Sequence, residues 1–363
     1  MTDTNGGTTG DDGLARLVDR AGLREFLAAE LGSADGFHIE RHQVGHSNET
    51  LFLSWGDREL VLRRPPPGET AESAHDVLRE ARFIDAVADT EVPVPNVVAT
   101  CDDHSVIGSD FFLMDRLAGD VIREREPERF AVADQRRRVG MELVETLVSI
   151  HDVDWRSIGL TEFGPGEGYL DDQVDLWRRQ LEEWLLPKTE AERELPYVRD
   201  VADWLAANVP AEADETLVHG DFKLDNVMFG PGTPPAVVGV FDWEMATVGD
   251  PLADLGWLLL FWPDATDPEH EIPDSLLPGI PAREGYPTRR DLVTRYEEAT
   301  GREFANERFY RALAAYKITT ACEAMYLRYV SGEADDPMYP LLETGVPAMA
   351  ERAMRLVEGD ERL

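Results

Sequence analysis

Two carboxylates and one amide follow short apolar segments in the second half of the chain. Asp221 comes three residues after the apolar pair 217–218 in the stretch LVHGDFKLDN, and Asn226 follows it five residues later. Phosphoryl transfer needs a carboxylate that orients an acceptor hydroxyl and takes its proton, and it needs oxygen ligands for Mg²⁺. One loop with this spacing can supply both. The pattern therefore predicts a phosphotransferase loop, and the alternative is an ordinary turn rich in Asp and Asn.

The second carboxylate, Asp242, ends the apolar segment 237–241. A charged side chain at the end of a buried strand is costly unless it is paired or binds a metal. With Asp221 and Asn226 it forms a predicted MgATP site, and the alternative is a simple turn or cap residue. Glu244 is a weaker candidate for a metal or substrate contact and is otherwise a solvated or helix-terminal acid.

The elements that must position these residues fall into two regions. Up to about residue 115, periodicity predicts a small sheet with helices at 14–31 and 71–88 and strands at 51–53, 59–63 and 111–114. Beyond residue 119 the pattern is helical, with helices expected at 135–151, 171–186 and 197–208, short strands at 217–218 and 237–241, and mostly helix after 251. The architecture is thus a sheet-rich small lobe and a helical large lobe, with a ligand expected in the cleft between them.

The composition indicates a globular protein. The chain has 363 residues, of which 43% are hydrophobic, enough for two cores. No segment approaches the ~20 apolar residues of a membrane helix, and Cys101 and Cys322 are too few for a disulfide framework or a cysteine metal site. Residues 1–13 lack the features of a signal peptide and are predicted to be a disordered tail. We therefore expect a cytoplasmic location.

The net charge of −37 is the unusual feature of the composition. A field this negative repels nucleic acids and anionic membranes, so neither is expected as a partner. Only Lys188, Lys223 and Lys317 are lysines. An acid excess with few lysines resembles proteins of extreme halophiles, in which molar salt shortens the Debye length to ~3 Å and screens self-repulsion. The alternative is an acidic surface that serves solubility alone.

The motif HGD-x4-N, followed by a strand and an Asp, resembles the aminoglycoside phosphotransferase and choline kinase superfamily. Further matching stretches are VLRRPP from residue 61, AHD from 74, VPVP from 92 and FDWEMAT from 241 leading into GDPLADL. They resemble the branch that includes kinase domains fused to acyl-CoA dehydrogenases, over residues 25–330. The resemblance implies an α+β, bilobal, protein kinase-like fold with a small antiparallel-sheet N-lobe at 14–116, which binds nucleotide. A mostly helical C-lobe at 117–363 would carry the catalytic and acceptor-binding residues.

The resemblance implies a role for each matching residue. Asp221 is expected to be the catalytic base, and Asn226 and Asp242 are expected to bind Mg²⁺. His219 is similar to a structural residue of the catalytic loop. Asp254 is similar to the acid that braces that loop, and Asp250 is interpreted in the same way.

In the N-lobe, the family places a cation on the third strand, where it pairs with the nucleotide phosphates and with a helix glutamate. Arg63 and Glu80 match these positions. Arginine departs from the usual lysine, and its longer, planar guanidinium changes the geometry, so whether it fully replaces lysine stays open. The alternatives are an exposed strand arginine and an ordinary surface acid.

The nucleotide loop, VGHSNET from residue 44, has one glycine and is the weakest match. Ser47 and Asn48 are the candidates for phosphate contacts, because small polar residues can present backbone N–H groups to an anion. From its place between the lobes, the hinge around Met114, Asp115 and Leu117 is expected to offer backbone groups to adenine.

The predicted activity is transfer of the γ-phosphoryl group of ATP to a hydroxyl of a small molecule. A hydroxyacyl compound, a sugar and an amino alcohol are the acceptor classes considered, with the first favoured, and residues 171–184 and 310–329 are expected to wall the acceptor site. The alternative is a pseudokinase that binds nucleotide and regulates. A kinase acting on proteins is disfavoured, because the chain between Asp242 and Asp254 is too short for an activation segment. The oligomeric state is not predicted.

Overall fold

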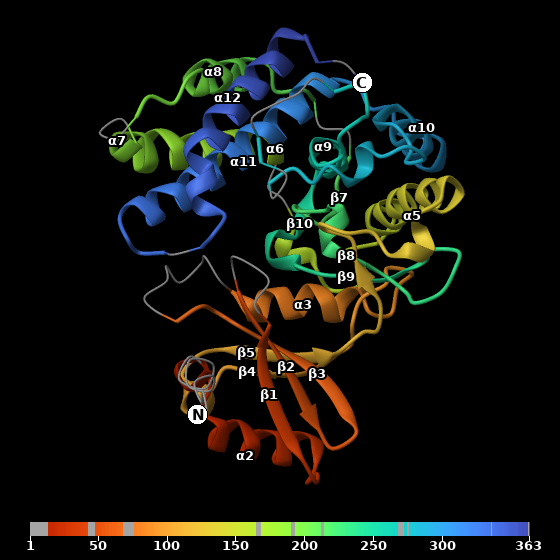
Figure 1. The fold of residues 1–363 in the computed structure, drawn as a ribbon, viewed down its shortest axis with the longest axis vertical. Coiled ribbons are helices and arrows are strands. Elements are labelled where there is room, and N and C mark those ends of the chain that lie inside the picture. The colour runs from red at the N-terminus through yellow and green to blue at the C-terminus, as the bar shows by residue number, and fades with distance from the viewer. Residues whose placement is uncertain are drawn as a thin grey trace, which may run out of the picture. The chain divides into compact units, whose positions relative to one another are not determined.

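The computed structural model describes residues 14–42, 48–67, 76–164, 168–189, 193–211, 214–267, 272–273, 276–334, 336–361 and 363 (Figure 1). The chain divides into two compact units. The first comprises residues 1–118 together with Gly239–Met245, and the second comprises residues 119–238 and 246–363. The segment that carries Asp242 therefore belongs to the first unit, although it lies far along the chain.

The first unit is built on a five-stranded antiparallel sheet in the order β1-β2-β3-β5-β4. The strands are β1 (Phe37–His42), β2 (Glu49–Trp55), β3 (Arg58–Arg64), β4 (Val97–Cys101) and β5 (Phe111–Asp115). Leu60 and Leu62 of β3 face a core shared with helix α2 (Arg20–Leu31). Because side chains alternate along a strand, Arg63 points to the opposite face, where helix α3 (Val77–Val87) lies. Figure 1 shows the two helices on opposite sides of the sheet.

Two elements of this unit differ from what the sequence predicted. The helix expected at 14–31 is interrupted, because Asp19 caps a new helix at Arg20 by accepting hydrogen bonds from the N–H groups of Ala21 (2.9 Å) and Gly22 (3.2 Å). Strand β1 was not predicted. Only Ile39 is buried in it, since it is an edge strand, and the alternation that marks a strand is therefore weak.

The second unit is mostly helical. It contains α5 (Ala133–His151), α6 (Tyr169–Arg179), a π-helical segment (Gln180–Leu185), α7 (Leu186–Thr189), α8 (Val198–Ala207), α9 (Pro251–Leu260), α10 (Arg289–Thr300), α11 (Glu307–Val330) and α12 (Leu342–Glu358). Short strands β7 (Thr216–Val218) and β10 (Thr247–Gly249) form one antiparallel pair, and β8 (Val227–Phe229) lies between β6 (Asp120–Val121) and β9 (Val237–Val240). None of the helices in the described residues combines the length and apolar character needed to cross a membrane.

Helix α9 forms the centre of the second unit and packs against α11 (Figure 1). Nearly all its residues are buried. The two helices approach closely at Gly256, where a Cβ would come within 2.8 Å of the Tyr310 backbone oxygen. This contact fixes the faces of α9 and α11 that point toward the loop after β7, and those faces carry Trp257 and Lys317.

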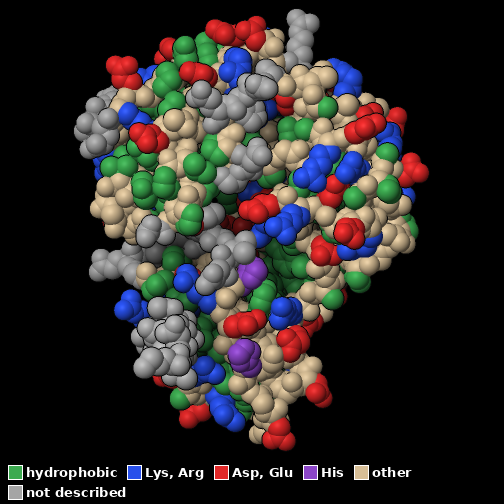
Figure 2. All heavy atoms as spheres, in the orientation of Figure 1, with side chains coloured by type: hydrophobic (Ala, Val, Ile, Leu, Met, Phe, Trp, Pro, Cys, Tyr) green, Lys and Arg blue, Asp and Glu red, His purple; other side chains and the backbone are tan. Residues whose placement is uncertain are grey.

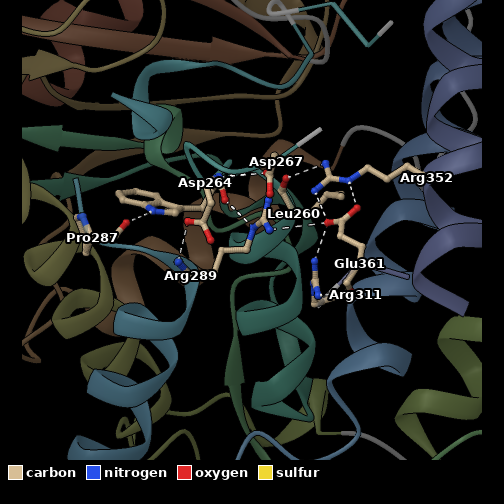
Figure 3. Close-up of polar contacts among 9 residues, drawn as sticks. Leu260, Asp264, Asp267, Pro287, Arg289, Arg311, Arg352 and Glu361 are labelled. Atoms are coloured by element: carbon tan, nitrogen blue, oxygen red, sulfur yellow. Dashed lines mark hydrogen bonds and ion pairs between the residues drawn. The ribbon is translucent and has the colours of Figure 1, made fainter. Parts of the chain in front are cut away.

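A buried ionic cluster ties the last described residues to this helical core (Figure 3). The carboxylate of Glu361 accepts hydrogen bonds from Arg311 (2.6 Å) and Arg352 (2.9 and 3.1 Å). Arg289 lies 3.8 Å away and pairs with Asp267. Burial alone would raise the pKa of Glu361, but the arginines outweigh it and lower the pKa to about 2.

Replacing Glu361 should leave three arginines with too little negative charge. We expect Glu361→Gln to lower the free energy of unfolding by about 3 kcal/mol at pH 7, the value that a pKa of about 2 implies against an ordinary 4.5. Because the folded-state pKa is depressed, this contribution is complete above about pH 4.5 and disappears as the pH falls toward 2. Urea unfolding at fixed KCl across this range measures it, with the exposed Glu358→Gln as control. A loss equal to that of the control would contradict the role of the cluster.

Acidic side chains are spread over the described surface and lie among basic ones on the face drawn in Figure 2. The 72 acids outnumber the 35 bases by 37, so the chain carries a large excess of negative charge. The mutual repulsion of these acids opposes the compact state unless salt screens it.

We therefore expect the melting temperature to rise as KCl is increased from low to molar concentration. Thermal melts followed by circular dichroism test this, and a parallel series in sucrose separates charge screening from solute exclusion, which also stabilises folded proteins. An unchanged midpoint from low to molar KCl would count against a salt-dependent fold.

Candidate functional site

Asp221 lies in the loop that follows β7, and its carboxylate is held on both oxygens. Oδ1 accepts a hydrogen bond from the indole N–H of Trp257 (2.8 Å), and Oδ2 accepts one from Asn226 Nδ2 (2.9 Å). Asn226 ends a short 3₁₀ turn, Leu224–Asn226, and Nδ2 also donates to the backbone oxygen of Asp221 (2.9 Å). The structure therefore brings Asp221 and Asn226 together, and the amide oxygen of Asn226 is the group left to accept or to bind a metal.

Lys223 is a functional candidate that the sequence reasoning missed. Its ammonium lies 3.0 Å from Asp221 Oδ1, and its side chain is only 18% exposed. The cation therefore offsets the negative charge of Asp221. The sequence held a signal for it. Few lysines occur in the chain, and this one lies two residues after the predicted base Asp221.

Asp254 holds the loop that carries Asp221. Its carboxylate accepts hydrogen bonds from the backbone N–H groups of His219 (2.6 Å) and Gly220 (2.8 Å), and His151 Nε2 lies 3.4 Å away. Burial would raise the pKa of Asp254, but His151 and His219 outweigh it, so the net shift is downward. The carboxylate therefore stays charged in a buried site and can hold both N–H groups.

Asp250 occupies a different position from the one expected for it. It is the N-cap of α9, where Oδ1 accepts from the N–H of Leu252 (2.9 Å) and Oδ2 accepts from the Tyr310 hydroxyl (3.0 Å). Tyr310 is itself buried, as is Tyr316, so these two residues of the segment expected to wall the acceptor site lie in the core of the second unit.

In the first unit, Arg63 lies between two carboxylates. Its Nε is 3.1 Å from Glu80, and its Nη2 donates to Asp242 Oδ1 at 3.0 Å. Burial would lower the pKa of Arg63, but the charges of Glu80, Asp242 and Glu244 raise it above its usual value. Asp242 has a backbone φ of 68°, in the left-handed region that is unfavourable outside glycine. The backbone strain thus occurs at Asp242, the residue whose carboxylate contacts Arg63.

Three carboxylates of the first unit lie around Arg63. Glu80, Asp242 and Glu244 surround the single guanidinium of Arg63, and burial together with the neighbouring carboxylates raises the pKa of Glu80. Asn48 donates to Glu244 (3.0 Å), so the predicted phosphate residue lies beside this cluster. Among the described residues, nothing donates a hydrogen bond to the second oxygen of Asp242. A carboxylate oxygen that accepts no hydrogen bond from the described residues is a hard donor of the kind that a divalent cation prefers.

The remaining predicted nucleotide residues lie in two places. Ser47 lies outside the described residues. Met114 and Asp115 end β5 in the sheet, with Asp115 also accepting from Asn96 (2.9 Å). The N–H of Leu117 donates to no backbone oxygen of the described chain, in contrast to that of Arg116. Leu117 is therefore the hinge residue with a backbone donor available to a ligand.

The chain is similar to known phosphotransferases in sequence and structure. The sequence model of the phosphotransferase enzyme family matches residues 38–292. Human acyl-CoA dehydrogenase family member 11 is 31% identical over 368 residues, which cover 96% of this chain and 45% of that protein. The chain thus spans about half the length of the curated relatives it matches.

Solved structures show the same fold. A Ralstonia eutropha protein assigned to the aminoglycoside phosphotransferases has a TM-score of 0.75 at 28% identity, covering 94% of this chain and 99% of that one. An aminoglycoside phosphotransferase in a ternary complex with ADP and hygromycin B has a TM-score of 0.58 at 16% identity, covering 94% and 99%. The predicted kinase-like α+β fold is confirmed. The resemblance to the aminoglycoside phosphotransferases and to the acyl-CoA dehydrogenase family members is confirmed as well. The chain belongs to the phosphotransferase enzyme family.

Proposed function

We propose that this protein is an ATP-dependent kinase that phosphorylates a hydroxyl of a small molecule. The observation that carries the proposal is the arrangement of Asp221, Asn226 and Lys223. An oriented carboxylate, an amide with its oxygen available and a cation lie within one loop. These are the three kinds of group that phosphoryl transfer requires of a protein.

In the proposed reaction, Asp221 accepts the proton of the acceptor hydroxyl. The acceptor oxygen forms a bond to the γ-phosphorus of ATP while the bond between that phosphorus and the bridging oxygen breaks, releasing ADP. Trp257 and Asn226 hold the carboxylate in one orientation, so little reorganisation is needed when the acceptor arrives. The ammonium of Lys223 stabilises negative charge on the transferred group.

Mg²⁺ is the proposed cofactor, and Asn226 and Asp242 are its proposed ligands. The residues fit the ion, because the amide of Asn226 and the carboxylate of Asp242 both offer hard oxygen atoms. When bound, Mg²⁺ neutralises charge on the phosphates.

Nucleotide binding is assigned to the first unit. Arg63, fixed by Glu80, is proposed to contact the phosphates, with Ser47 and Asn48 contributing from the preceding loop. Leu117, together with Met114 and Asp115, is proposed to face adenine. Nucleotide binding is supported by the relative that was solved with ADP.

One observation favours the pseudokinase alternative. Arg63 pairs directly with Asp242, so a proposed metal ligand is occupied by a cation in this structure. An enzyme must exchange this contact for one with the phosphates when nucleotide binds. A pseudokinase would retain it.

Arg63→Lys tests the nucleotide assignment. A lysine ammonium cannot contact Glu80 and a phosphate with the planar, forked geometry of a guanidinium. We expect KM for ATP to rise about tenfold, as for loss of one charged hydrogen bond. Steady-state kinetics measure this, and Arg58→Lys on the exposed end of β3 is the matched control. Equal KM and kcat in Arg63→Lys and the wild type would show that the assignment is wrong.

A pair of variants separates the roles of the two carboxylates. Asp221→Asn should bind MgATP normally and lose turnover by roughly 10²–10⁴, because it removes a general base. Asp242→Asn should weaken Mg²⁺-dependent ATP binding as well as turnover. Calorimetric titrations with and without Mg²⁺, paired with ADP-release assays, measure both, and the exposed Asp85→Asn is the control.

Two outcomes would contradict these assignments. Loss of nucleotide binding in Asp221→Asn, with normal binding and turnover in Asp242→Asn, would exchange the two roles. Unchanged turnover in both variants would overturn the kinase proposal itself.

A further inference from the structure

Lys317 is a buried cation that the phosphoryl-transfer reaction does not use. It lies on α11 and is 6% exposed. Its ammonium lies 4.9 Å from the ring centre of Trp257 and 5.5 Å from that of Trp177, so two indoles flank it. Such contacts favour a cation, although each is worth only about 1–2 kcal/mol.

This cation lacks an ionic partner. Within the described part of the chain, no carboxylate forms an ion pair with Lys317 and no oxygen accepts its hydrogen bond. Burial lowers the pKa of Lys317, and the charges of Asp254 and Asp221 oppose the shift without contacting it. Both carboxylates are already engaged, Asp254 by the loop backbone and Asp221 by Lys223 and Trp257.

Several other buried arginines of the described chain are paired with carboxylates, whereas Arg64 donates to backbone oxygens. Arg289, Arg311 and Arg352 share Glu361 and Asp267, and Arg63 has Glu80. A buried charge without a partner is costly, and the chain has few lysines to begin with. Lys317 thus differs from the paired arginines, because among the described residues it has no carboxylate partner.

The position of Lys317 relates it to the proposed base. The indole of Trp257 contacts the ammonium with its ring and donates its N–H to Asp221 Oδ1 at 2.8 Å. A group bound at Lys317 would therefore be separated from the reacting hydroxyl by about the span of one indole. The protein as a whole carries a charge of −37 and repels anions, so an anionic substrate would need local cations of this kind.

We propose that Lys317, between Trp177 and Trp257, binds an anionic oxygen group of the acceptor, a carboxylate or a phosphate. The acceptor class is then a small hydroxylated acid, whose anion supplies the counter-ion that Lys317 lacks. This inference rests on the proposed kinase function for its chemistry, but anion binding at Lys317 can be measured without turnover.

The test compares acceptors that differ in charge alone. The probes are straight-chain hydroxycarboxylates of increasing length, their primary amides and matching hydroxyalkyl phosphates, all at one fixed KCl concentration. Turnover is followed by ADP release, and binding by tryptophan fluorescence in the presence of MgADP. The variants are Lys317→Met, which keeps the length and removes the charge, and Lys317→Arg, which keeps the charge. The matched control is Lys188→Met, at the exposed lysine of α7.

We expect the wild type and Lys188→Met to prefer one class of anion over the amides at least tenfold in kcat/KM. Lys317→Met should lose this preference through a raised KM for the anion, with ATP affinity and amide kinetics unchanged, and Lys317→Arg should retain most of it. The carboxylate and phosphate series show which anion is bound.

Equal use of amides and anions by the wild type, or an unchanged preference in Lys317→Met, would overturn the inference. If Lys317→Met does not fold, the preference of the wild type and of Lys317→Arg for anions over amides still tests the inference. If no acceptor is phosphorylated, the kinase proposal fails separately. Anion binding by fluorescence, present in the wild type and lost in Lys317→Met, would then still support the subsite, and its absence in the wild type would refute it.

Discussion

The second unit depends on one buried carboxylate, that of Asp254. It accepts the backbone N–H groups of His219 and Gly220, and this fixes the turn from which Asp221 projects. Asp254 can hold this place because α9 is buried along its length and packs closely on α11 at Gly256. The direction of the proposed base is thus set by helix packing at the centre of the unit, and not by the loop alone.

Charged side chains are arranged differently at the surface and in the interior of the protein. The surface is strongly acidic, whereas the buried positions pair arginines with carboxylates in fixed geometry, as around Glu361 and Arg63. Arginine suits such sites because its guanidinium binds two carboxylates in a plane and is more weakly hydrated than an ammonium. Two of the few lysines lie near the proposed base. Lys223 contacts Asp221 directly, and Lys317 contacts the ring of Trp257, which donates to Asp221.

Much of the fold could be predicted from the sequence, because periodic segments such as helix α5 and strand β2 bury one clear face. The weakly patterned edge strand β1 and the break before α2 could not, since a cap at Asp19 overrides the periodicity. The grouping of Asp221 with Asn226 followed from their spacing. The ion pair of Arg63 with Asp242 and the indoles around Lys317 join distant segments, and no local pattern indicates them. The roles assigned to these residues remain predictions.

The most direct test of the central claim is ³¹P NMR of the protein with MgATP and the panel of hydroxylated acceptors. The account predicts a phosphate monoester coupled to the protons of the acceptor carbon, formed in an amount equal to the ADP released. Retention of ATP in a bound state with no monoester from any acceptor, or release of ADP with inorganic phosphate alone, would contradict it.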